Sequence, residues 1–278
     1  MSKRKYSPLA IAAGVALSVS SVALAATYPA DWLNLKPWKL TLPIGPSNSA
    51  TEIKQPALAT YSITPWFRLN SSGVSVLFRA NAGGSRTSTN TAYARSELRE
   101  MTADGQSLAG WSCQSATRHM HLEQVLNRTT TVKPQASIGQ IHDNTNDNVM
   151  LFYRGPSRAN GTSDTGRIEA YFNDQTTNVL LDSAYHLGDH MTVDINVSGG
   201  AATVTYKNTT TGATKVAGPY QLTGVVGQCY FKAGLYVQSC SKVDSNGNTN
   251  QACVAKNLSK YDTASAYAEL GIQKLTID

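Results

Sequence analysis

The fold is indicated most clearly by residues 191–208, MTVDINVSGGAATVTYKN. Apolar side chains occupy every second position from 191 to 197, and the alternation resumes from 202 to 206 after the pair Gly199-Gly200. A period of two places successive side chains on opposite faces of a strand, and a glycine pair allows the tight turn between two strands. This stretch therefore predicts an antiparallel hairpin with one buried face.

The same pattern recurs along most of the chain. Period-two runs are found at 75–80, 93–101, 119–126, 149–153, 167–172 and 266–277. Glycine- and asparagine-rich turns separate them, at 81–84, 103–105 and 144–148. No long segment keeps the 3.6-residue apolar period of a helix, and only 57–61 suggests a short one. Many strands and few helices predict an all-β protein, a jelly-roll sandwich of two antiparallel sheets with a concave substrate-binding face.

The N-terminus has the composition of a secretory signal peptide. A basic start, KRK at 3–5, precedes an apolar run at 8–24 that ends in the small residues of ALA at 23–25. We therefore expect cleavage near Ala25, export of the mature chain, and a single catalytic domain over 26–278. A retained membrane anchor is the alternative, and no later stretch is apolar enough to span a bilayer.

The charge balance bears on the partners of the protein. The full chain has 24 Lys+Arg and 18 Asp+Glu, a net charge of +6. Three basic residues and no acidic ones leave with the predicted signal, so the mature chain has 24 − 3 = 21 basic against 18 acidic residues. This is not the strongly basic composition of a nucleic-acid-binding protein, and it is compatible with an acidic substrate. We expect a monomer with no nucleic-acid partner and, after cleavage, no membrane partner.

Four cysteines in an exported chain suggest two disulfides. Cys240 and Cys253 flank a polar segment, and a bridge between them would close a floppy loop and stabilise the fold by about 3 kcal/mol on the chain-entropy model. Cys113 and Cys229 would then be left to pair, with two separate buried thiols as the alternative. No cysteine has the C-x₂-C spacing of a metal site, and we expect neither a metal nor another cofactor.

Three of the predicted strands carry an unusual polar face. Alternation within 95–99, 140–142 and 229–238 places these polar side chains opposite an apolar face: Arg95, Glu97, Arg99, Gln140, His142, Tyr230, Lys232, Tyr236 and Gln238. Any one such run is typical of a solvated strand face. Together, two Arg, a Lys, a Glu, two Gln, a His and two Tyr would bind sugar hydroxyls and carboxylates. The other histidines, at 119, 121, 186 and 190, we interpret as structural.

These groups suit elimination from a uronic acid. The C5 proton beside a carboxylate is poorly acidic because its removal builds a dianion, so the carboxylate must first be neutralised. Arg95 can pair with that carboxylate and Gln140 can donate an amide hydrogen bond to it. His142 can accept the proton or steady the charge. Tyr236 can protonate the leaving oxygen, and could act as base if nearby cations lower its pKa.

At these residues the chain resembles polysaccharide lyase family 7, the alginate lyases. The resemblance rests on WKLTLP at 38–43, RSELR at 95–99, QIH at 140–142 and YFKAGLYVQ at 230–238, and it runs in the family's order from about residue 33 to the C-terminus. It implies a β-jelly roll whose concave sheet binds alginate and whose chemistry needs no metal. It also implies roles for individual residues: Arg95 and Gln140, with His142, neutralise the uronate carboxylate, His142 or Tyr236 is the base, Tyr236 is the acid, and Glu97, Arg99, Tyr230, Lys232 and Gln238 bind neighbouring sugars or orient the catalytic groups.

Two core-facing positions bear on how closely the chain follows the family. Val237 stands where Asn is common, and because alternation points it into the core we expect little effect on the chemistry. The Ile of QIH is associated in the family with activity on guluronate-containing blocks, which implies a preference for guluronate or mixed blocks. Ile141 itself should face away from the substrate, so it can act only by shifting its strand.

Two other functions fit a polar face on a sandwich. A non-catalytic carbohydrate-binding module would use such a face, but it has no need for Arg, His and Tyr together. A glycoside hydrolase would need two carboxylates, for which Glu97 and Asp143 are the candidates. Loops at 86–92 and 158–165 have the composition of segments that could cover a binding groove.

Overall fold

The computed structural model describes residues 1, 26–156 and 164–278. The predicted signal peptide therefore lies outside the described residues, apart from Met1, as does most of the predicted groove-covering loop at 158–165. Within these residues, helical structure is limited to α1 (Pro29–Trp32), α2 (Gln251–Val254) and the 3₁₀ helix η1 (Ala57–Thr60). The short helix expected at 57–61 is thus a 3₁₀ turn, whereas α1 and α2 were not predicted. None of the described helices is long and apolar enough to cross a membrane.

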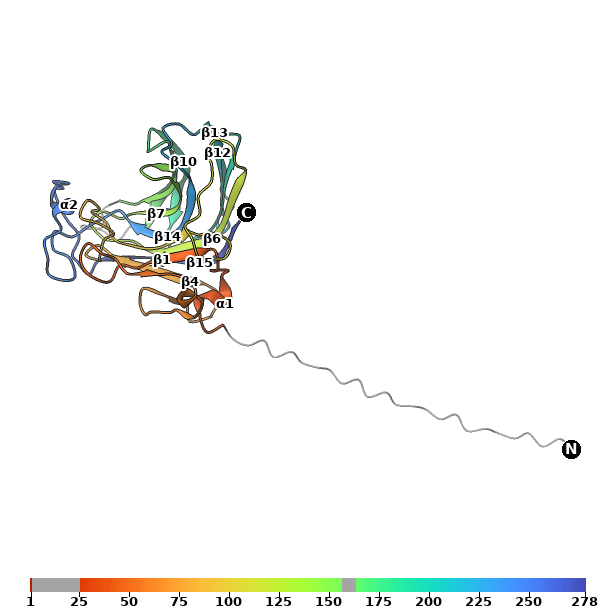
Figure 1. Ribbon diagram of the computed structural model, residues 1–278, viewed down its shortest axis with the longest axis horizontal. Helices are drawn as coiled ribbons and strands as arrows, with labels where there is room; N and C mark the ends of the chain where they lie inside the picture. Colours follow the sequence, from red (N-terminus) through yellow and green to blue (C-terminus); the bar gives the residue numbers. More distant parts are fainter. Residues whose placement is uncertain (2–25, 157–163) are drawn as a thin grey trace.

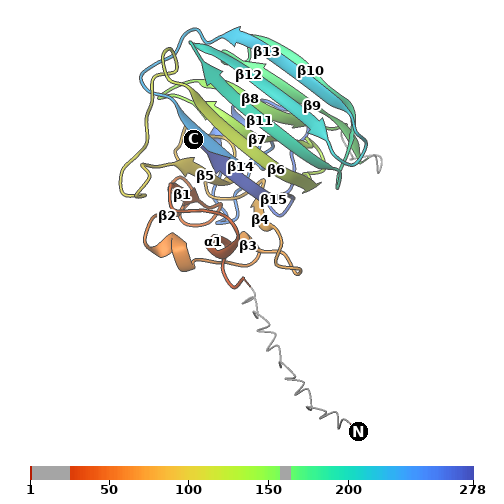
Figure 2. The same ribbon diagram turned by 90° about the vertical axis from the view of Figure 1, so that its right-hand side faces the viewer.

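Strands form two antiparallel sheets, packed one on the other as Figure 2 shows. The eight-stranded sheet has the order β10 (Thr177–His186), β9 (Thr165–Phe172), β8 (Asp147–Arg154), β7 (Gln135–His142), β14 (Tyr230–Val237), β5 (Arg95–Glu100), β1 (Trp38–Thr41) and β2 (Glu52–Ile53). The seven-stranded sheet has the order β13 (Thr214–Gln221), β12 (Ala201–Asn208), β11 (His190–Ser198), β6 (Arg118–Arg128), β15 (Tyr267–Ile277), β4 (Val76–Asn81) and β3 (Phe67–Leu69). Both sheets bend between the end that carries β10 and β13 and the end that carries β1 and β4 (Figure 1). The predicted all-β jelly-roll sandwich is confirmed.

The hairpin expected at 191–208 is formed by β11 and β12. Val193 pairs with Tyr206 and Ile195 with Val204, and all four side chains are buried. Gly199 and Gly200 have φ values of 57° and 79°, the left-handed conformation that a two-residue hairpin turn requires at both positions.

The core lies between the two sheets and is filled by the apolar faces that alternation predicted. Ile141 of β7 and Phe231 of β14 contribute to it from the eight-stranded sheet, and Leu122 of β6 from the seven-stranded sheet. Phe231 packs against Trp111 with ring centroids 5.1 Å apart. Because these residues face inward, their polar neighbours on β7, β14 and β5 must face the outside of the eight-stranded sheet.

Both predicted disulfides are present, and the alternative of free thiols at Cys113 and Cys229 is wrong. Cys113 bridges Cys229 with the Cα atoms 5.5 Å apart, and Cys240 bridges Cys253 at 6.0 Å. Cys229 directly precedes β14 and Cys240 follows it closely, so the two bridges hold the two ends of this strand.

The segment between Cys240 and Cys253 is more ordered than the expected floppy loop. Asp244 and Asn250 within it are buried, and Asp244 forms an ion pair with Arg86 at 3.6 Å. Arg86 also donates a hydrogen bond to Asn250. Asn250 in turn caps α2 by accepting the N–H of Cys253 at 3.0 Å, which explains why a helix begins there. Buried charge pairing thus fixes a segment whose composition alone resembles a mobile loop.

Candidate active site

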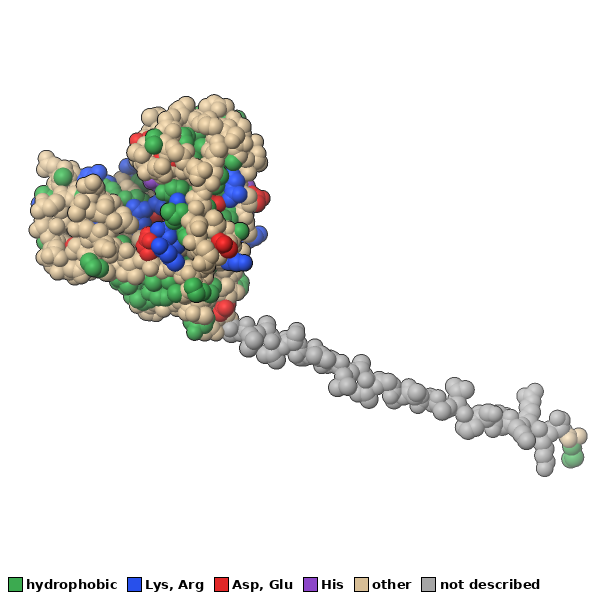
Figure 3. Space-filling view, in the orientation of Figure 1, with side chains coloured by type: hydrophobic (Ala, Val, Ile, Leu, Met, Phe, Trp, Pro, Cys, Tyr) green, Lys and Arg blue, Asp and Glu red, His purple; other side chains and the backbone are tan. Residues whose placement is uncertain are grey.

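The three polar motifs lie on adjacent strands of the eight-stranded sheet. Its order places β14 between β7 and β5, and Lys232 of β14 pairs with both Gln140 and Arg99. Tyr236 pairs with Arg95, and Tyr230 with His142. Arg95 and Tyr236, which are 236 − 95 = 141 positions apart in the chain, therefore share one surface. The alternate residues of each strand face the core. Figure 3 shows a hollow between the part that carries α2 and the part that carries β10 and β13, with Lys, Arg and His side chains gathered in it.

Glu97 is the centre of this cluster. One carboxylate oxygen accepts hydrogen bonds from Arg95 Nη1 at 2.9 Å and Lys232 Nζ at 2.7 Å, and the other accepts from Gln140 Nε2. Burial alone would raise the pKa of Glu97, but Lys232 and Arg95 outweigh it and hold the pKa below its usual value. Glu97 is therefore a buried, ionised carboxylate that orients three other side chains through charge-assisted hydrogen bonds.

Lys232 is buried beside Arg95 as well as Glu97. Burial and the positive charge of Arg95 lower its pKa to about 8, with Glu97 acting in the opposite direction. The guanidinium of Arg95 also stacks on the ring of Tyr236, 3.8 Å from its centroid. Within the described residues, Arg95 Nε and Gln140 Oε1 are buried without a hydrogen-bond partner. Buried polar atoms are normally satisfied, so each of these two atoms has hydrogen-bonding capacity that the described residues leave unused.

His142 is held in one tautomer. Its Nδ1 is hydrogen-bonded to the carbonyl oxygen of Asp143, and because a carbonyl can only accept, Nδ1 carries the hydrogen. Nε2 is then left with its lone pair. The ring stacks on Tyr230 with centroids 5.6 Å apart. Burial and the charge of Lys232 lower the pKa of His142, so the imidazole is neutral near physiological pH and can accept a proton.

Tyr236 is poised as an acid. Its ring packs edge-on against Tyr93, with centroids 6.1 Å apart. Burial raises the pKa of Tyr236, and the opposing effect of Arg95 does not cancel it. A tyrosine base would need nearby cations to lower its pKa, and for Tyr236 the pKa is instead raised, so the phenol keeps its proton.

The remaining predicted site residues flank the cluster. Arg99 stacks on Tyr230, 3.8 Å from the ring centroid, and its guanidinium donates to the backbone carbonyls of Glu100 and Ala109. Gln238 lies just beyond the end of β14 with its side chain partly exposed. Both occupy the surface on either side of the central residues.

Residues outside the motifs also reach the cluster. Asp147 begins β8, pairs with His142 across the β7–β8 hairpin and lies 3.5 Å from its Nε2. Tyr93 precedes β5 and contacts Tyr236. The alternation of 149–153 indicated the strand that Asp147 begins, but its pairing with His142 depends on the register of the hairpin, which composition does not reveal.

The alternative candidates have structural roles. The Asp143 carboxylate accepts the backbone N–H groups of Thr145, Asn146 and Val226. On the seven-stranded sheet His119 and His121 each bind the carboxylate of Asp194 at 2.8 Å, in agreement with the structural interpretation. Within 26–156 and 164–278, no three His, Cys, Asp or Glu side chains are grouped so as to bind a metal ion.

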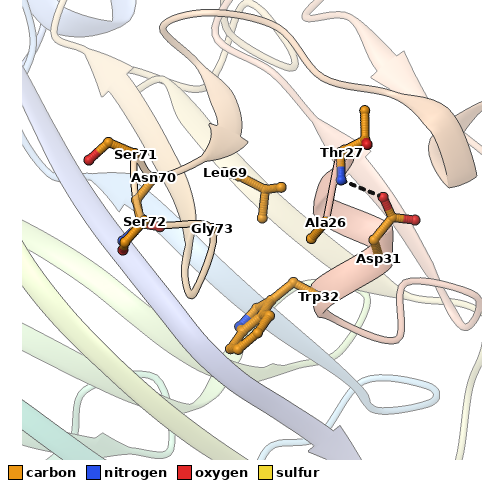
Figure 4. Close-up of a pocket in the computed structure, with 9 residues that line it drawn as sticks. All are labelled: Ala26, Thr27, Asp31, Trp32, Leu69, Asn70, Ser71, Ser72 and Gly73. Atoms are coloured by element: carbon orange, nitrogen blue, oxygen red, sulfur yellow. Dashed lines mark hydrogen bonds between the residues drawn. The ribbon is translucent and has the colours of Figure 1, made fainter. Parts of the chain in front are cut away.

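A separate cavity of about 930 Å³ lies beside α1 and the turn after β3 (Figure 4). It is lined by Ala26, Thr27, Asp31, Trp32, Leu69, Asn70, Ser71, Ser72 and Gly73. Its one charged group, Asp31, accepts the backbone N–H groups of Thr27 and Tyr28 at 2.8 Å. Because no basic side chain lines this cavity, it does not suit an acidic substrate, and it contains none of the candidate site residues.

The cluster on β5, β7 and β14 falls within a region that matches a known family. The family model described as alginate lyase matches residues 33–278. The chain belongs to the alginate lyase family. A curated family member from Klebsiella pneumoniae, named alginate lyase, is 34% identical over 153 residues, which cover 45% of this chain and 50% of that protein. The match thus spans about half the length of that relative.

Solved structures of family members cover nearly the whole fold. Alginate lyase AlgAT5 from polysaccharide lyase family 7 is 35% identical, with a TM-score of 0.70 over 91% of this chain and 99% of its own. The alginate lyase from Corynebacterium sp. is 32% identical, with a TM-score of 0.73 over 92% and 99%. A variant of alginate lyase A1-II′ in complex with its product, GGG, is 25% identical, with a TM-score of 0.65 over 91% and 99%. The fold and the assignment to polysaccharide lyase family 7 expected from the motifs are confirmed.

Proposed function

We propose that this family member cleaves the 1,4-glycosidic bond of alginate by β-elimination and leaves a 4,5-unsaturated uronate at the new non-reducing end. The observation that carries the proposal is the cluster around Glu97, in which two cations, a neutral imidazole and a protonated phenol lie on one hollowed face. An acidic polysaccharide fits this face because Arg95 and Lys232 supply more positive charge than Glu97 removes. Family membership and the product complex of alginate lyase A1-II′ support the same substrate class.

Binding of a uronate would first neutralise its carboxylate. Arg95 Nε, which lacks a partner within the described residues, can donate to a carboxylate oxygen. Gln140 donates one amide hydrogen to Glu97 and has a second one to offer, while its buried Oε1 can accept from a sugar hydroxyl. Neutralisation lowers the cost of building negative charge at C5 and so makes the C5 proton removable.

Elimination then needs one base and one acid. Nε2 of His142 takes the C5 proton, and the electron pair of the C5–H bond forms the C4–C5 double bond. The C4–O bond breaks with its electron pair on oxygen, which takes the proton of the Tyr236 hydroxyl. His142 then loses its proton to solvent and Tyr236 regains one. The lowered pKa of His142 and the raised pKa of Tyr236 match these roles, since the base must be neutral and the acid protonated.

The flanking residues would hold neighbouring sugars. Arg99, Tyr230 and Gln238 lie along the same surface, and Glu97 and Lys232 keep Arg95 and Gln140 in place. A preference for guluronate-containing or mixed blocks is proposed from QIH at 140–142. Ile141 is fully buried in the core, so its influence would pass through the position of β7. A strong preference for polymannuronate would contradict this part.

Export belongs to the same proposal. The basic and apolar pattern of residues 1–25 and the two disulfides fit a secreted or periplasmic monomer that meets its polymer outside the cytoplasm. Identification of the N-terminal residue of the secreted protein tests it, with cleavage near Ala25 as the expected result.

The pKa values of the two candidate carboxylates, Glu97 and Asp143, argue against a glycoside hydrolase. The general acid of such an enzyme needs a raised pKa. Burial acts to raise the pKa of both Glu97 and Asp143, but ion pairs at Glu97 and backbone hydrogen bonds at Asp143 leave both below their usual values.

The deciding experiment follows ultraviolet absorbance of the purified protein with polyguluronate, polymannuronate and mixed alginate. A lyase product absorbs because its new double bond is conjugated with the carboxylate, whereas a hydrolase product does not. We expect a rise with and without chelator, fastest on guluronate-containing substrate. Binding of alginate with no rise would instead support a carbohydrate-binding module.

A further inference from the structure

The position of the Asp147 carboxylate, next to the candidate active site, needs an explanation. It lies beside a cluster that would bind a polyanion, where a negative charge repels the substrate and so weakens binding. Its side chain is 24% exposed and that of His142 is 22% exposed, so water screens their interaction only in part. In the described part of the chain His142 is its single ion-pair partner.

The geometry of the pair distinguishes the two protonation states of His142. With the hydrogen on Nδ1 and bound to the Asp143 carbonyl, Nε2 presents a lone pair to Asp147 Oδ1 at 3.5 Å. An ionised carboxylate and a lone pair cannot form a hydrogen bond, which agrees with this separation. Once Nε2 carries a proton, the same two atoms can form a charge-assisted hydrogen bond. The interaction therefore strengthens only after the proton has moved.

We propose that Asp147 is a positioning residue for His142. Its carboxylate stabilises the imidazolium that forms when Nε2 of His142 takes the C5 proton. An interaction that strengthens between ground state and transition state accelerates the chemical step, whereas one of equal strength in both does not. The hairpin supplies the alignment, because His142 and Asp147 are register partners on β7 and β8. This role deepens the proposed lyase mechanism and rests on His142 acting as its base.

Other groups around His142 also oppose or add to the stabilisation of its imidazolium by Asp147. Lys232 and the stacked Tyr230 approach from β14, and Glu97 lies on β5. Burial and Lys232 disfavour the imidazolium, whereas Asp147, the Asp143 carbonyl and Glu97 favour it. Removing the charge of Asp147 should therefore lower the pKa of His142 further.

The first test measures this effect without substrate. We would follow the imidazole nitrogens of His142 by NMR across pH in the wild-type protein, with H142N used to assign the signal. In D147N and D147A we expect the pKa of His142 to fall by about one unit, the lower end of the range for loss of an opposite charge at this distance. D147A is included because the amide of Asn could itself donate to Nε2.

The matched control is D174N. Asp174 is an exposed carboxylate in the turn after β9, where its backbone N–H donates to the carbonyl oxygen of Asp147 at 3.0 Å. Asn tolerates its positive φ of 52°. D174N removes a nearby negative charge that does not face His142, so the pKa of His142 should not change.

The second test measures kcat/KM against pH by ultraviolet absorbance. In D147A the acidic limb should move to lower pH by the same amount as the NMR titration, and kcat above that limb should fall about tenfold. An unchanged pKa of His142 in both variants would overturn the inference, as would equal effects in D174N. An NMR shift in a protein that produces no ultraviolet change on any alginate would leave the Asp147–His142 contact in place and refute the proposed function instead.

Discussion

Lys232 makes the cluster sensitive to pH at the scale of a single residue. It is buried against Glu97 at 2.7 Å and its pKa is lowered to about 8, first by burial and then by Arg95. Above that pH the site loses a positive charge that offsets Glu97. The phenol of Tyr236, whose pKa is raised by burial, stays protonated in the same range and does not limit the reaction.

We therefore expect kcat/KM to fall as pH rises through about 8. Folding stability should not fall with it. The unfolded chain, with an ordinary lysine pKa of about 10.4, binds more protons than the folded chain between pH 8 and that value, so the contribution of Lys232 to stability rises with pH. Activity profiles and thermal unfolding measured at the same pH values separate the two effects. In K232M the activity at pH 7 should already be low and the alkaline limb near pH 8 absent, and a limb that persisted would show that another group causes it.

Tyr236 offers a test of chemistry that leaves the fold intact. No described residue forms a hydrogen bond with its hydroxyl that Phe would break, and the ring contacts with Tyr93 and Arg95 remain in Y236F. We expect kcat to fall about 10²–10⁴-fold, as for loss of one acid–base group. The unfolding free energy should change by less than about 0.5 kcal/mol, the usual range for substitutions that remove no buried contact. Near-full activity of the folded variant would remove Tyr236 from the mechanism.

At the scale of elements, β14 places the site because it pairs with β5 on one side and β7 on the other. Gly234 lies in its middle with φ of 121°, opposite Glu97. A Cβ atom there would lie 2.8 Å from the carbonyl oxygen of Ser96 and 3.0 Å from the Cα of Glu97. The glycine thus allows the two strands to approach closely where Glu97 meets Lys232.

G234A should be more destabilising than a substitution that also places a side chain at positive φ but creates no clash. The comparison is G212A, since Gly212 also has positive φ, 84°, and has nothing within 4 Å of its Cβ position. We expect losses of about 3 kcal/mol for G234A and about 1 kcal/mol for G212A in denaturant unfolding. We expect a lower activity in G234A but not in G212A. Equal losses of stability in the two variants would mean that β5 and β14 move apart to accept the added methyl group.

The β7 strand shows where sequence alternation fails at this scale. Ile138 and Ile141 are both fully buried in the core although they are three positions apart, so the period of two is broken at Gly139. The pairings of β7 with β14 and with β8 both change register between Ser137 and Gln140. A second irregularity in the pairing with β8 falls between Ile141 and His142. The shared face of Gln140 and His142 was nevertheless predicted correctly, because the side chains of β7 alternate from 140 onward.

At the scale of the whole molecule, the two disulfides constrain β14 from both ends. Cys240 and Cys253 pack in one apolar cluster with Tyr93, against which the ring of Tyr236 also packs. Cys229 is bridged to Cys113, and its backbone N–H and C=O also exchange hydrogen bonds with Trp111 at 2.8 and 2.9 Å. Loss of the Cys240–Cys253 bridge therefore loosens the apolar cluster that packs against Tyr236. After loss of the Cys113–Cys229 bridge, Cys229 is still held by its backbone hydrogen bonds to Trp111.

The double variants C240S/C253S and C113S/C229S should separate activity from stability. The bridges close segments with sequence separations of 13 and 116, for which the chain-entropy model expects losses of about 3 and about 5 kcal/mol. At a temperature where both variants are folded, we expect the larger drop in kcat/KM in C240S/C253S. Unfolding curves and ultraviolet assays of the two proteins test this. A larger drop in kcat/KM in C113S/C229S would show that the site depends more on the bridge at the Cys229 end of β14.

Sequence alone determined many of the strands, the face on which each candidate residue lies and the family, whereas the pairing of Cys113 with Cys229 was settled only by the structure. These follow from a period of two and from motif order, both of which are local properties of the chain. Tertiary structure alone decided that Glu97 binds Arg95, Lys232 and Gln140 together and that Asp147 faces His142. It also decided that burial outweighs the nearby cation Arg95, so that the pKa of Tyr236 is raised. It also decided that the segment between Cys240 and Cys253 is held by Arg86. The physical reason is that hydrogen bonds, charge pairs and desolvation depend on which strands are neighbours and in what register, and this is established only when segments far apart in the chain pack against one another.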